Sequence, residues 1–280
     1  MILMLISINI GFDGFYILND VLTDEEIILS NSSYNNIYIY SLKNKLLKNI
    51  GEFNGFNISL SKDRKKILLR NNGRILLLTT DGKYKILAEE GEKVGYPVWY
   101  NELVAYTCEG KINIVDTNGV KKGEIKGVNS YFISTNGKIF AFQENDKIYI
   151  IDENGNKELI TPGDGIFYGP TFSLDGSMII FNSVGEGIFL YNILEKKTYF
   201  VSEGFNPRFS NDSKKIVFNI SRDDGERIIS SEIYIYDIEK RKIEKITDTP
   251  DINEIKPIFS LDGKKIFYSL TDGRIGFIEI

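Results

Sequence analysis

Short runs of β-branched and aromatic residues, separated by turns rich in Gly, Asn and Asp, follow one another along the chain. Seven of these runs begin with Ile, and their first residues are 38, 37, 36, 40, 45 and 42 positions apart. The runs are IYIY (37–40), ILLL (75–78), INIV (112–115), IYII (148–151), IFLY (188–191), IYIY (233–236) and IGFI (275–278). Runs of this composition bounded by turn residues predict β-strands. No stretch has a convincing helical period.

A second phrase recurs ahead of these strands. It reads FSLDGKK at 259–265 and FSLDGSM at 172–178, with relatives at 60–66, 133–138 and 209–215. Its central residues are Asp63, Asn136, Asp175, Asp212 and Asp262. The phrase predicts a hairpin turn, because Gly accepts a positive φ and Asp bonds its own backbone. Arg64 and Ser213 replace Gly in two copies, which leaves the turn geometry open there.

The repeats predict an all-β fold, a seven-bladed β-propeller with four antiparallel strands in each blade. Self-similarity at a period near 40 residues indicates a repeat architecture, and four-stranded units around a centre are propeller blades. In the fifth unit the strands are expected at 170–173, 178–183, 188–192 and 197–202. We expect one domain over 1–280, with blades at about 14–50, 54–88, 95–126, 129–161, 167–202, 205–247 and 254–280.

The last unit shows only three strands, at 256–260, 264–269 and 274–279. The apolar segment ILMLISIN (2–9) precedes the first blade, and we expect it to close the ring as the missing outer strand, since an unpaired edge favours aggregation. The alternative is a signal-peptide remnant, but no basic residue precedes the segment and no small-residue cleavage site follows it.

Composition excludes several kinds of chemistry. The chain has no His and a single Cys, Cys108, so His-dependent catalysis and an internal disulfide are excluded.

Lys and Arg are dispersed and the net charge is −5, which argues against a nucleic-acid partner. The N-terminal apolar stretch is too short to span a membrane. The acidic stretches 221–226 and 247–254 lack the EF-hand spacing, so we expect neither a metal nor a cofactor.

The pattern P-x-F/W-S-x-D-G-K-K-I, at 170–179, 207–216 and 257–266, resembles the TolB-like or PD40 family of β-propeller repeats. Relatives in that family include TolB, the propellers of prolyl-oligopeptidase-like enzymes and lyases acting on oligogalacturonate. The chain has no room for the extra domain of TolB and lacks the G-x-S-x-G of the peptidases. The resemblance also implies that the lyases depend on histidine, which is absent here.

Aromatic residues next to glycine precede five of the predicted inner strands. They are Phe15, Phe56, Tyr96, Tyr168 and Phe205. Loops that enter the inner strands emerge on one face of a propeller, so these rings are expected around the mouth of its channel, where exposed aromatics suit ligand capture. The alternative is that they pack between blades as ordinary core.

The loop between the second and third strands of blade six, 220–231, is the longest of its kind and belongs to the same face. We therefore predict a binding patch that comprises Tyr168, Phe205, Arg208 and the charged loop residues Arg222, Asp223, Asp224, Glu226 and Arg227, with Tyr96 and Phe56 nearby on the mouth. No catalytic residue is predicted.

These features favour a non-enzymatic binding scaffold that engages a protein, a peptide or an envelope glycan through the mouth loops, as a monomer. The alternative is a carboxylate- or tyrosine-based carbohydrate-active enzyme that uses the channel. A third possibility is a regulatory partner of a separately encoded enzyme. The expected location is the cytoplasm, with the periplasm or the extracellular space as the alternative.

Overall fold

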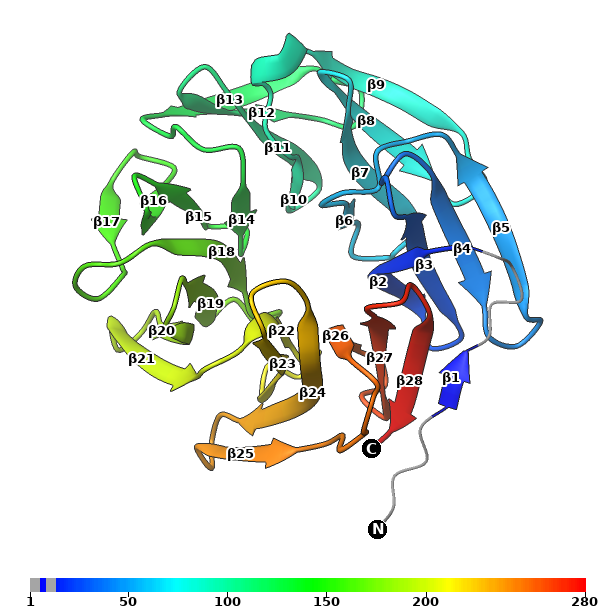
Figure 1. Cartoon of the computed structure of the whole chain (residues 1–280). Coiled ribbons are helices and arrows are strands. Elements are labelled where there is room, and N and C mark those ends of the chain that lie inside the picture. Colours follow the sequence, from blue (N-terminus) through cyan, green and yellow to red (C-terminus); the bar gives the residue numbers. More distant parts are fainter. Residues whose placement is uncertain (1–5, 9–13) are drawn as a thin grey trace.

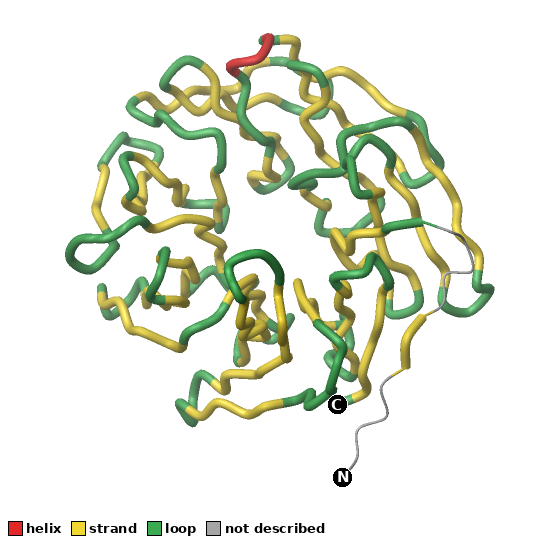
Figure 2. Tube along the Cα trace, viewed as in Figure 1, coloured by secondary structure: helices red, strands yellow, loops and turns green. Residues whose placement is uncertain are grey.

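In the computed structural model, which describes residues 6–8 and 14–280, seven four-stranded antiparallel sheets stand around a central axis (Figure 1). The predicted seven-bladed β-propeller is therefore confirmed. Figure 2 shows strands and loops along the described chain, interrupted by one short 3-10 helix, η1 (Gly91–Lys93). None of the described helices is long and apolar enough to cross a membrane.

The strands are used in chain order, from the axis outward. Blade 1 has β2 (Tyr16–Thr23), β3 (Glu26–Asn31), β4 (Ile37–Ser41) and β5 (Leu46–Gly51); blade 2 has β6 (Ser59–Leu60), β7 (Lys66–Asn71), β8 (Arg74–Thr79) and β9 (Tyr84–Glu89). Blade 3 has β10 (Val98–Tyr100), β11 (Leu103–Cys108), β12 (Lys111–Val115) and β13 (Lys121–Lys126); blade 4 has β14 (Ile133–Thr135), β15 (Ile139–Glu144), β16 (Lys147–Asp152) and β17 (Lys157–Leu159).

Blade 5 has β18 (Phe167–Phe172), β19 (Met178–Ser183), β20 (Gly187–Asn192) and β21 (Lys197–Ser202); blade 6 has β22 (Phe205–Phe209), β23 (Lys215–Asp223), β24 (Ile228–Asp237) and β25 (Lys242–Lys245). Blade 7 has β26 (Glu254–Phe259), β27 (Lys265–Leu270), β28 (Ile275–Glu279) and β1 (Ile6–Ile8). Loops that enter the innermost strands and loops between second and third strands share one face, which we call the loop face. The opposite side, with the turns after the innermost strands, is the turn face.

The N-terminal strand closes the ring, as predicted. β1 pairs antiparallel with β28, with Ile6 opposite Phe277 and Ile8 opposite Ile275. It is the outermost strand of blade 7, in the order β1-β28-β27-β26. The remainder of the predicted segment, 2–5 and 9, lies outside the described residues.

The core lies between the blades. Each apolar cluster in the described chain combines buried side chains of two neighbouring blades, and together the clusters cover all seven junctions. At the junction of blades 7 and 1, for example, Phe267 packs with Leu18 and Leu29, all three 3% exposed or less. Both faces of each sheet are thus covered, which explains why the second strands are nearly continuous apolar runs.

The recurring Ser-x-Asp phrase builds the turns on the turn face. The Ser260 hydroxyl donates to the Asp262 carboxylate at 2.7 Å, and the same oxygen accepts the Lys265 amide at 2.9 Å. The same bond joins Ser61 to Asp63, Ser173 to Asp175 and Ser210 to Asp212, each at 2.6 Å. The Ser260 hydroxyl and the Lys264 backbone N–H, with the charges of Lys264 and Lys265, hold the pKa of Asp262 below its usual value. The phrase recurs because each blade needs this turn.

Arg64 and Ser213 keep the turn geometry although they replace Gly. Their φ angles are 56° and 59°, in the left-handed region also used by Gly263 at 71°. Both side chains bond to a neighbouring blade, Arg64 to the Val21 carbonyl and Ser213 to the Asp175 amide. These bonds offset the cost of a left-handed conformation in a residue with a Cβ.

Hydrogen bonds near the turn face link every blade to the next. Besides the two bonds just given, they run from Trp99 to Ser59, from Asn101 to Gly137, from Asn136 to Gly176, from Asn211 to Leu261 and from the Asp262 amide to Asp24. The ring is therefore held by apolar clusters between the sheets and by one polar belt at their ends.

Deleting residues 1–10 should expose the edge of β28 and lower the free energy of unfolding by on the order of 2 kcal/mol, since the backbone bonds to β1 are lost. The measurement is the Tm, which should fall by several degrees in a protein of this size. An unchanged Tm would show that β1 does not stabilise the ring.

Ser260→Ala should cost about 1–2 kcal/mol, because Ser260 is fully buried and its hydroxyl serves both Asp262 and the Lys265 amide. Urea unfolding measures the loss. The control is Ser33→Ala, at an exposed loop position, which should unfold at the wild-type urea concentration. Equal midpoints for both variants would contradict this account of the turn.

Candidate functional site

Four aromatic side chains from four different blades meet on the loop face. Phe56 contacts Tyr34, Tyr96 and Phe132, with ring centroids 5.4, 5.5 and 6.2 Å apart. Tyr96 and Phe132 stack at 4.8 Å. Tyr34 lies between β3 and β4, and the other three precede β6, β10 and β14. We call these four residues the aromatic platform; Phe56 and Phe132 are each 40% exposed.

Lys256 meets the platform from blade 7. Its ammonium donates to the Tyr34 hydroxyl at 2.9 Å and lies 5.6 Å from the centre of the Tyr34 ring. Lys256 belongs to β26, the innermost strand of its blade, and its side chain is half-buried. A cation and a phenol therefore stand in contact at one end of the platform.

Arg70 supports the opposite side of the platform. Its guanidinium lies 5.7 Å from the centre of the Tyr96 ring and donates to the carbonyl and carboxylate of Glu92 at 3.0 and 3.2 Å. The Arg70 side chain is 18% exposed. It fixes the orientation of the Tyr96 ring through cation–π attraction.

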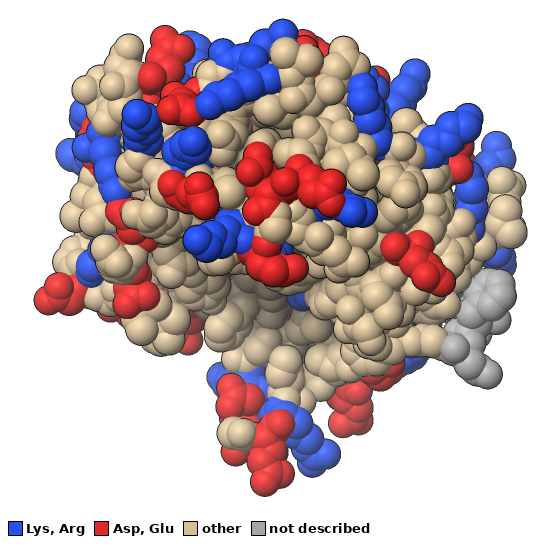
Figure 3. Space-filling model, turned by 90° about the horizontal axis from the view of Figure 1, so that it is seen from above, with Lys and Arg blue, Asp and Glu red and all other residues tan. Residues whose placement is uncertain are grey.

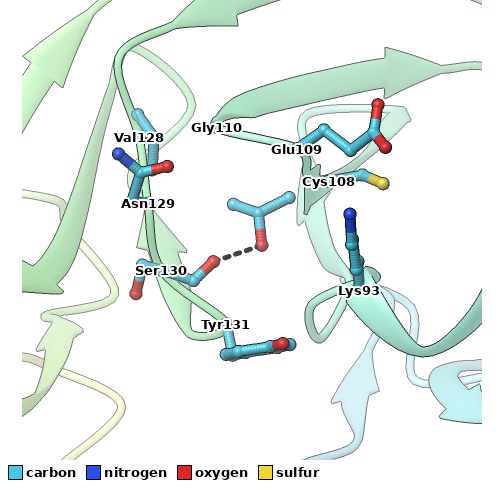
Figure 4. A pocket seen from close by; sticks show the side chains of 9 residues that line it. Lys93, Cys108, Glu109, Gly110, Val128, Asn129, Ser130 and Tyr131 are labelled. Atoms are coloured by element: carbon cyan, nitrogen blue, oxygen red, sulfur yellow. Dashed lines mark hydrogen bonds between the residues drawn. The ribbon is translucent and has the colours of Figure 1, made fainter.

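A cavity of about 340 Å³ lies beside the platform, between blades 3 and 4. Figure 4 shows Lys93, Cys108 and Glu109 on one side, Asn129 and Ser130 on the other. Thr107 donates to the Ser130 carbonyl at 2.5 Å across this junction. Tyr131, next to Phe132, lines the same cavity. The lining combines polar groups such as Asn129 and Ser130 with apolar area from residues such as Val128.

Cys108 does not have the properties of a nucleophile. Its side chain is buried, and burial raises the pKa of the thiol, with a further contribution from Glu90 and Glu109. A raised thiol pKa leaves little thiolate at neutral pH.

A buried carboxyl stands two residues before Lys256. Glu254 is fully buried; one oxygen accepts the Thr249 hydroxyl at 2.5 Å and the other has no partner among the described residues. Burial raises the pKa of Glu254 to about 7; Glu232 adds to the rise, while the Thr249 bond and Lys245 oppose it. The group titrates near neutrality inside the junction of blades 6 and 7.

The platform contains two of the residues that the sequence selected, Phe56 and Tyr96. Tyr168 is half-buried, and burial raises its pKa. Phe205 and Arg208 are exposed. No hydrogen bond, ion pair or ring contact within residues 14–280 joins these three to one another, so the patch stays a prediction.

The charged loop of blade 6 is shorter than expected. The strands continue past 220 and 231, with Ile220 opposite Glu232 and Arg222 opposite Ser230, so the turn covers only 224–227. The expected loop over 220–231 was therefore wrong: most of it is hairpin, because its residues continue the pairing of β23 with β24. The tip includes exposed Arg222, Asp223, Asp224, Glu226 and Arg227, and Figure 3 shows a lobe with charges of both signs projecting from the molecule.

Tyr34, Phe132 and Lys256 were not selected from the sequence. Phe132 follows Tyr131 and not a glycine, and Tyr34 lies in a loop between second and third strands, whereas the expected aromatics stand next to glycine ahead of innermost strands. The sequence does contain a signal for Lys256. The residue before the proline of the repeat is Gly169 in blade 5 and Asn206 in blade 6, so a lysine at this place in blade 7 is unusual.

Comparison with known proteins supports the class of fold and no finer family. No family model matches the chain, and no curated protein matches it. Among solved structures, an oligogalacturonate lyase in complex with manganese is similar at 12% identity, with a TM-score of 0.68 over 95% of this chain and 90% of that one. An oligogalacturonate lyase from Vibrio parahaemolyticus is 13% identical, with a TM-score of 0.73 over 96% and 91%. A chain of a mitotic checkpoint complex is 14% identical, with a TM-score of 0.72 over 99% and 93%.

These comparisons place the chain among the seven-bladed β-propellers. They also correct the expectation of a non-enzymatic scaffold. Two of the similar structures are lyases, so this fold also occurs in enzymes, and the absence of catalytic motifs gives no ground for a non-enzymatic scaffold. Scattered charge and missing motifs were a poor basis for excluding catalysis, because fold and composition do not determine activity.

The manganese of that lyase has no matching ligand set here. The chain lacks His, and within the described residues no three Cys, Asp or Glu side chains gather as metal ligands.

Glu254→Gln should stabilise the protein more at pH 8 than at pH 4. A carboxyl with a folded pKa of about 7, against a usual 4.5, keeps its proton in the folded state while the unfolded chain loses it. The free energy of unfolding therefore falls as pH rises from about 4.5 to 7 and then levels off. The Tm difference between variant and wild type at the two pH values measures this, and equal differences would show that Glu254 is ionised in the fold.

Proposed function

We propose that the protein is a carbohydrate-active enzyme that binds an acidic oligosaccharide across the aromatic platform. The observation that supports this proposal most directly is the contact between the Lys256 ammonium and the Tyr34 hydroxyl at the edge of that platform. The proposal also places the chain with the TolB-like propellers of the PD40 repeat type, on its Pro-x-Phe-Ser-x-Asp-Gly phrases.

The platform suits a sugar. Exposed rings such as Phe56 and Phe132 offer flat apolar area to the C–H faces of a pyranose, while hydroxyl and amide groups beside them fix its orientation. The neighbouring cavity supplies such groups in Asn129 and Ser130 and has room for part of a sugar unit.

An acidic sugar suits the cation. Lys256 stands on the innermost strand with its ammonium against a single neutral hydroxyl, so its charge has no carboxylate partner among the described residues. A uronate carboxylate would supply that partner through a charge-assisted hydrogen bond. Oligogalacturonate, which the names of the two similar lyases give as their substrate, is an acidic oligosaccharide of this class.

Tyr34 is the group in position for proton transfer. Before the elimination, the Tyr34 hydroxyl gives its proton to solvent, and the Lys256 ammonium stabilises the phenolate that remains. The phenolate oxygen takes the proton from the carbon next to the carboxylate, the electrons form a C=C bond, and the bond to the glycosidic oxygen breaks. The proton then passes from Tyr34 to that oxygen. Lys256 stabilises negative charge on the phenol oxygen and on the carboxylate during the step. No histidine is needed.

The test is to incubate the protein with a galacturonic acid oligomer and to follow the ultraviolet absorbance of the unsaturated product. Tyr34→Phe should lower kcat by roughly 10²- to 10⁴-fold with little change in KM, because the ring remains and only the proton-transfer group is lost. Phe56→Ala should mainly raise KM, because it removes binding area.

Tyr84→Phe is the matched control. Tyr84 is an exposed tyrosine on β9, the outer strand of blade 2, and it contacts Phe53 away from the platform. This variant should keep wild-type kcat and KM. Wild-type protein that forms no unsaturated product from acidic oligomers, or a fully active Tyr34→Phe, would refute the proposed function.

A further inference from the structure

Four blades contain a residue in the left-handed backbone region at the same place in the repeat, within the innermost strand in blades 5 to 7 and just ahead of it in blade 2. The residues are Asn57, Gly169, Asn206 and Lys256, with φ of 53°, 66°, 53° and 52°. Only one of them is glycine. In blades 5 to 7 the pairing register shifts around this residue, between Tyr168 and Thr171, Phe205 and Arg208, and Ile255 and Ile258. Two residues of the inner strand then lie opposite one of the second strand, which is a β-bulge.

The fold does not require a side chain at this position. Gly169 makes the same bulge in blade 5, and glycine adopts a positive φ without steric cost. Asn tolerates this region, whereas Lys has no local hydrogen bond to favour it. Lys256 is therefore held in an unfavourable conformation by its surroundings, and such strain is concentrated at functional sites.

The bulges of blades 6 and 7 converge on one buried amide. Asn219 is 1% exposed, and its side-chain oxygen accepts the Asn206 amide group at 3.0 Å and the Lys256 backbone N–H at 3.4 Å. The Asn219 amide group donates to the Ser221 and Ser231 hydroxyls at 2.8 and 3.3 Å. Asn206 and Lys256 thus lie side by side at the loop-face end of the two innermost strands.

We infer that these two bulges form a ligand-binding subsite beside the platform. In this subsite the Lys256 ammonium binds the carboxylate of a sugar unit, and the Asn206 side chain hydrogen-bonds the same unit. The inference rests on the proposed function and adds a residue and a subsite to it. The exposed Asn206 side chain uses one amide N–H on Asn219, and its second N–H and its oxygen match sugar hydroxyls. Asn219 holds the Asn206 side chain and the Lys256 backbone, so that the two residues keep a fixed separation.

The experiment compares Asn206→Gly and Lys256→Gly with Lys45→Gly, the matched control. Lys45 has a φ of 52° like Lys256 but is exposed in the outer turn of blade 1. Glycine keeps each backbone path and removes only the side chain. Binding of a galacturonic acid oligomer is measured by titration calorimetry, and Tm is measured on the same samples.

Asn206→Gly and Lys256→Gly should each bind the oligomer roughly 10-fold more weakly or worse, with a Tm no lower than wild type, because relief of the left-handed strain offsets the lost contacts. Lys45→Gly should bind as wild type. Wild-type affinity in Asn206→Gly together with weaker binding in Lys256→Gly would overturn this inference and leave the proposed function standing. Wild-type affinity in both variants would overturn both, because the proposed function also has Lys256 bind the carboxylate. Weaker binding with a clearly lower Tm would also overturn it, since the side chains would then be structural. A wild-type protein that binds no oligomer would overturn the inference and the proposed function together.

Discussion

Burial of both faces of every sheet against a neighbouring sheet is the constraint on which this structure depends. No blade has a core of its own, because each apolar cluster is shared by two blades. A missing junction would expose one face on each of two sheets, so the ring is stable only when it is closed. The polar belt on the turn face adds directional bonds to this apolar packing, and it fixes how each blade is rotated against the next.

The contrast between locally formed turns and contacts at the blade junctions explains which features could be predicted from the sequence. Strand positions, blade number and closure by the N-terminal segment follow from local patterns, since an Ile-led run or a Ser-x-Asp-Gly turn forms in the same way in every blade. The turns at Arg64 and Ser213 could not be predicted locally, because their left-handed geometry is stabilised by bonds to the neighbouring blade. The strand extension in blade 6 was missed because polar residues such as Ser221 and Arg222 resemble a loop, although they continue the pairing.

The candidate site was only partly predictable for a related reason. Phe56 and Tyr96 stand next to glycine ahead of innermost strands, but their neighbours lack this signal. Tyr34 lies between a second and a third strand, and no glycine adjoins Phe132. The contact between Lys256 and Tyr34 spans 222 positions of the chain, and only the closed ring brings blades 7 and 1 together. Catalytic geometry on a propeller is thus a property of the junctions, which a single blade's sequence does not contain.

Closure by β1 also sets an order on biosynthesis. Phe277 is synthesised about 270 residues after its partner Ile6. Until β28 has been made, β1 has no partner strand and the ring stays open. Long-range pairing of this kind is slow and leaves strands exposed while the chain is incomplete. The nascent protein therefore remains an open arc on the ribosome until β28 has left the exit tunnel, and only then can the junction of blades 7 and 1, which carries the contact between Lys256 and Tyr34, close.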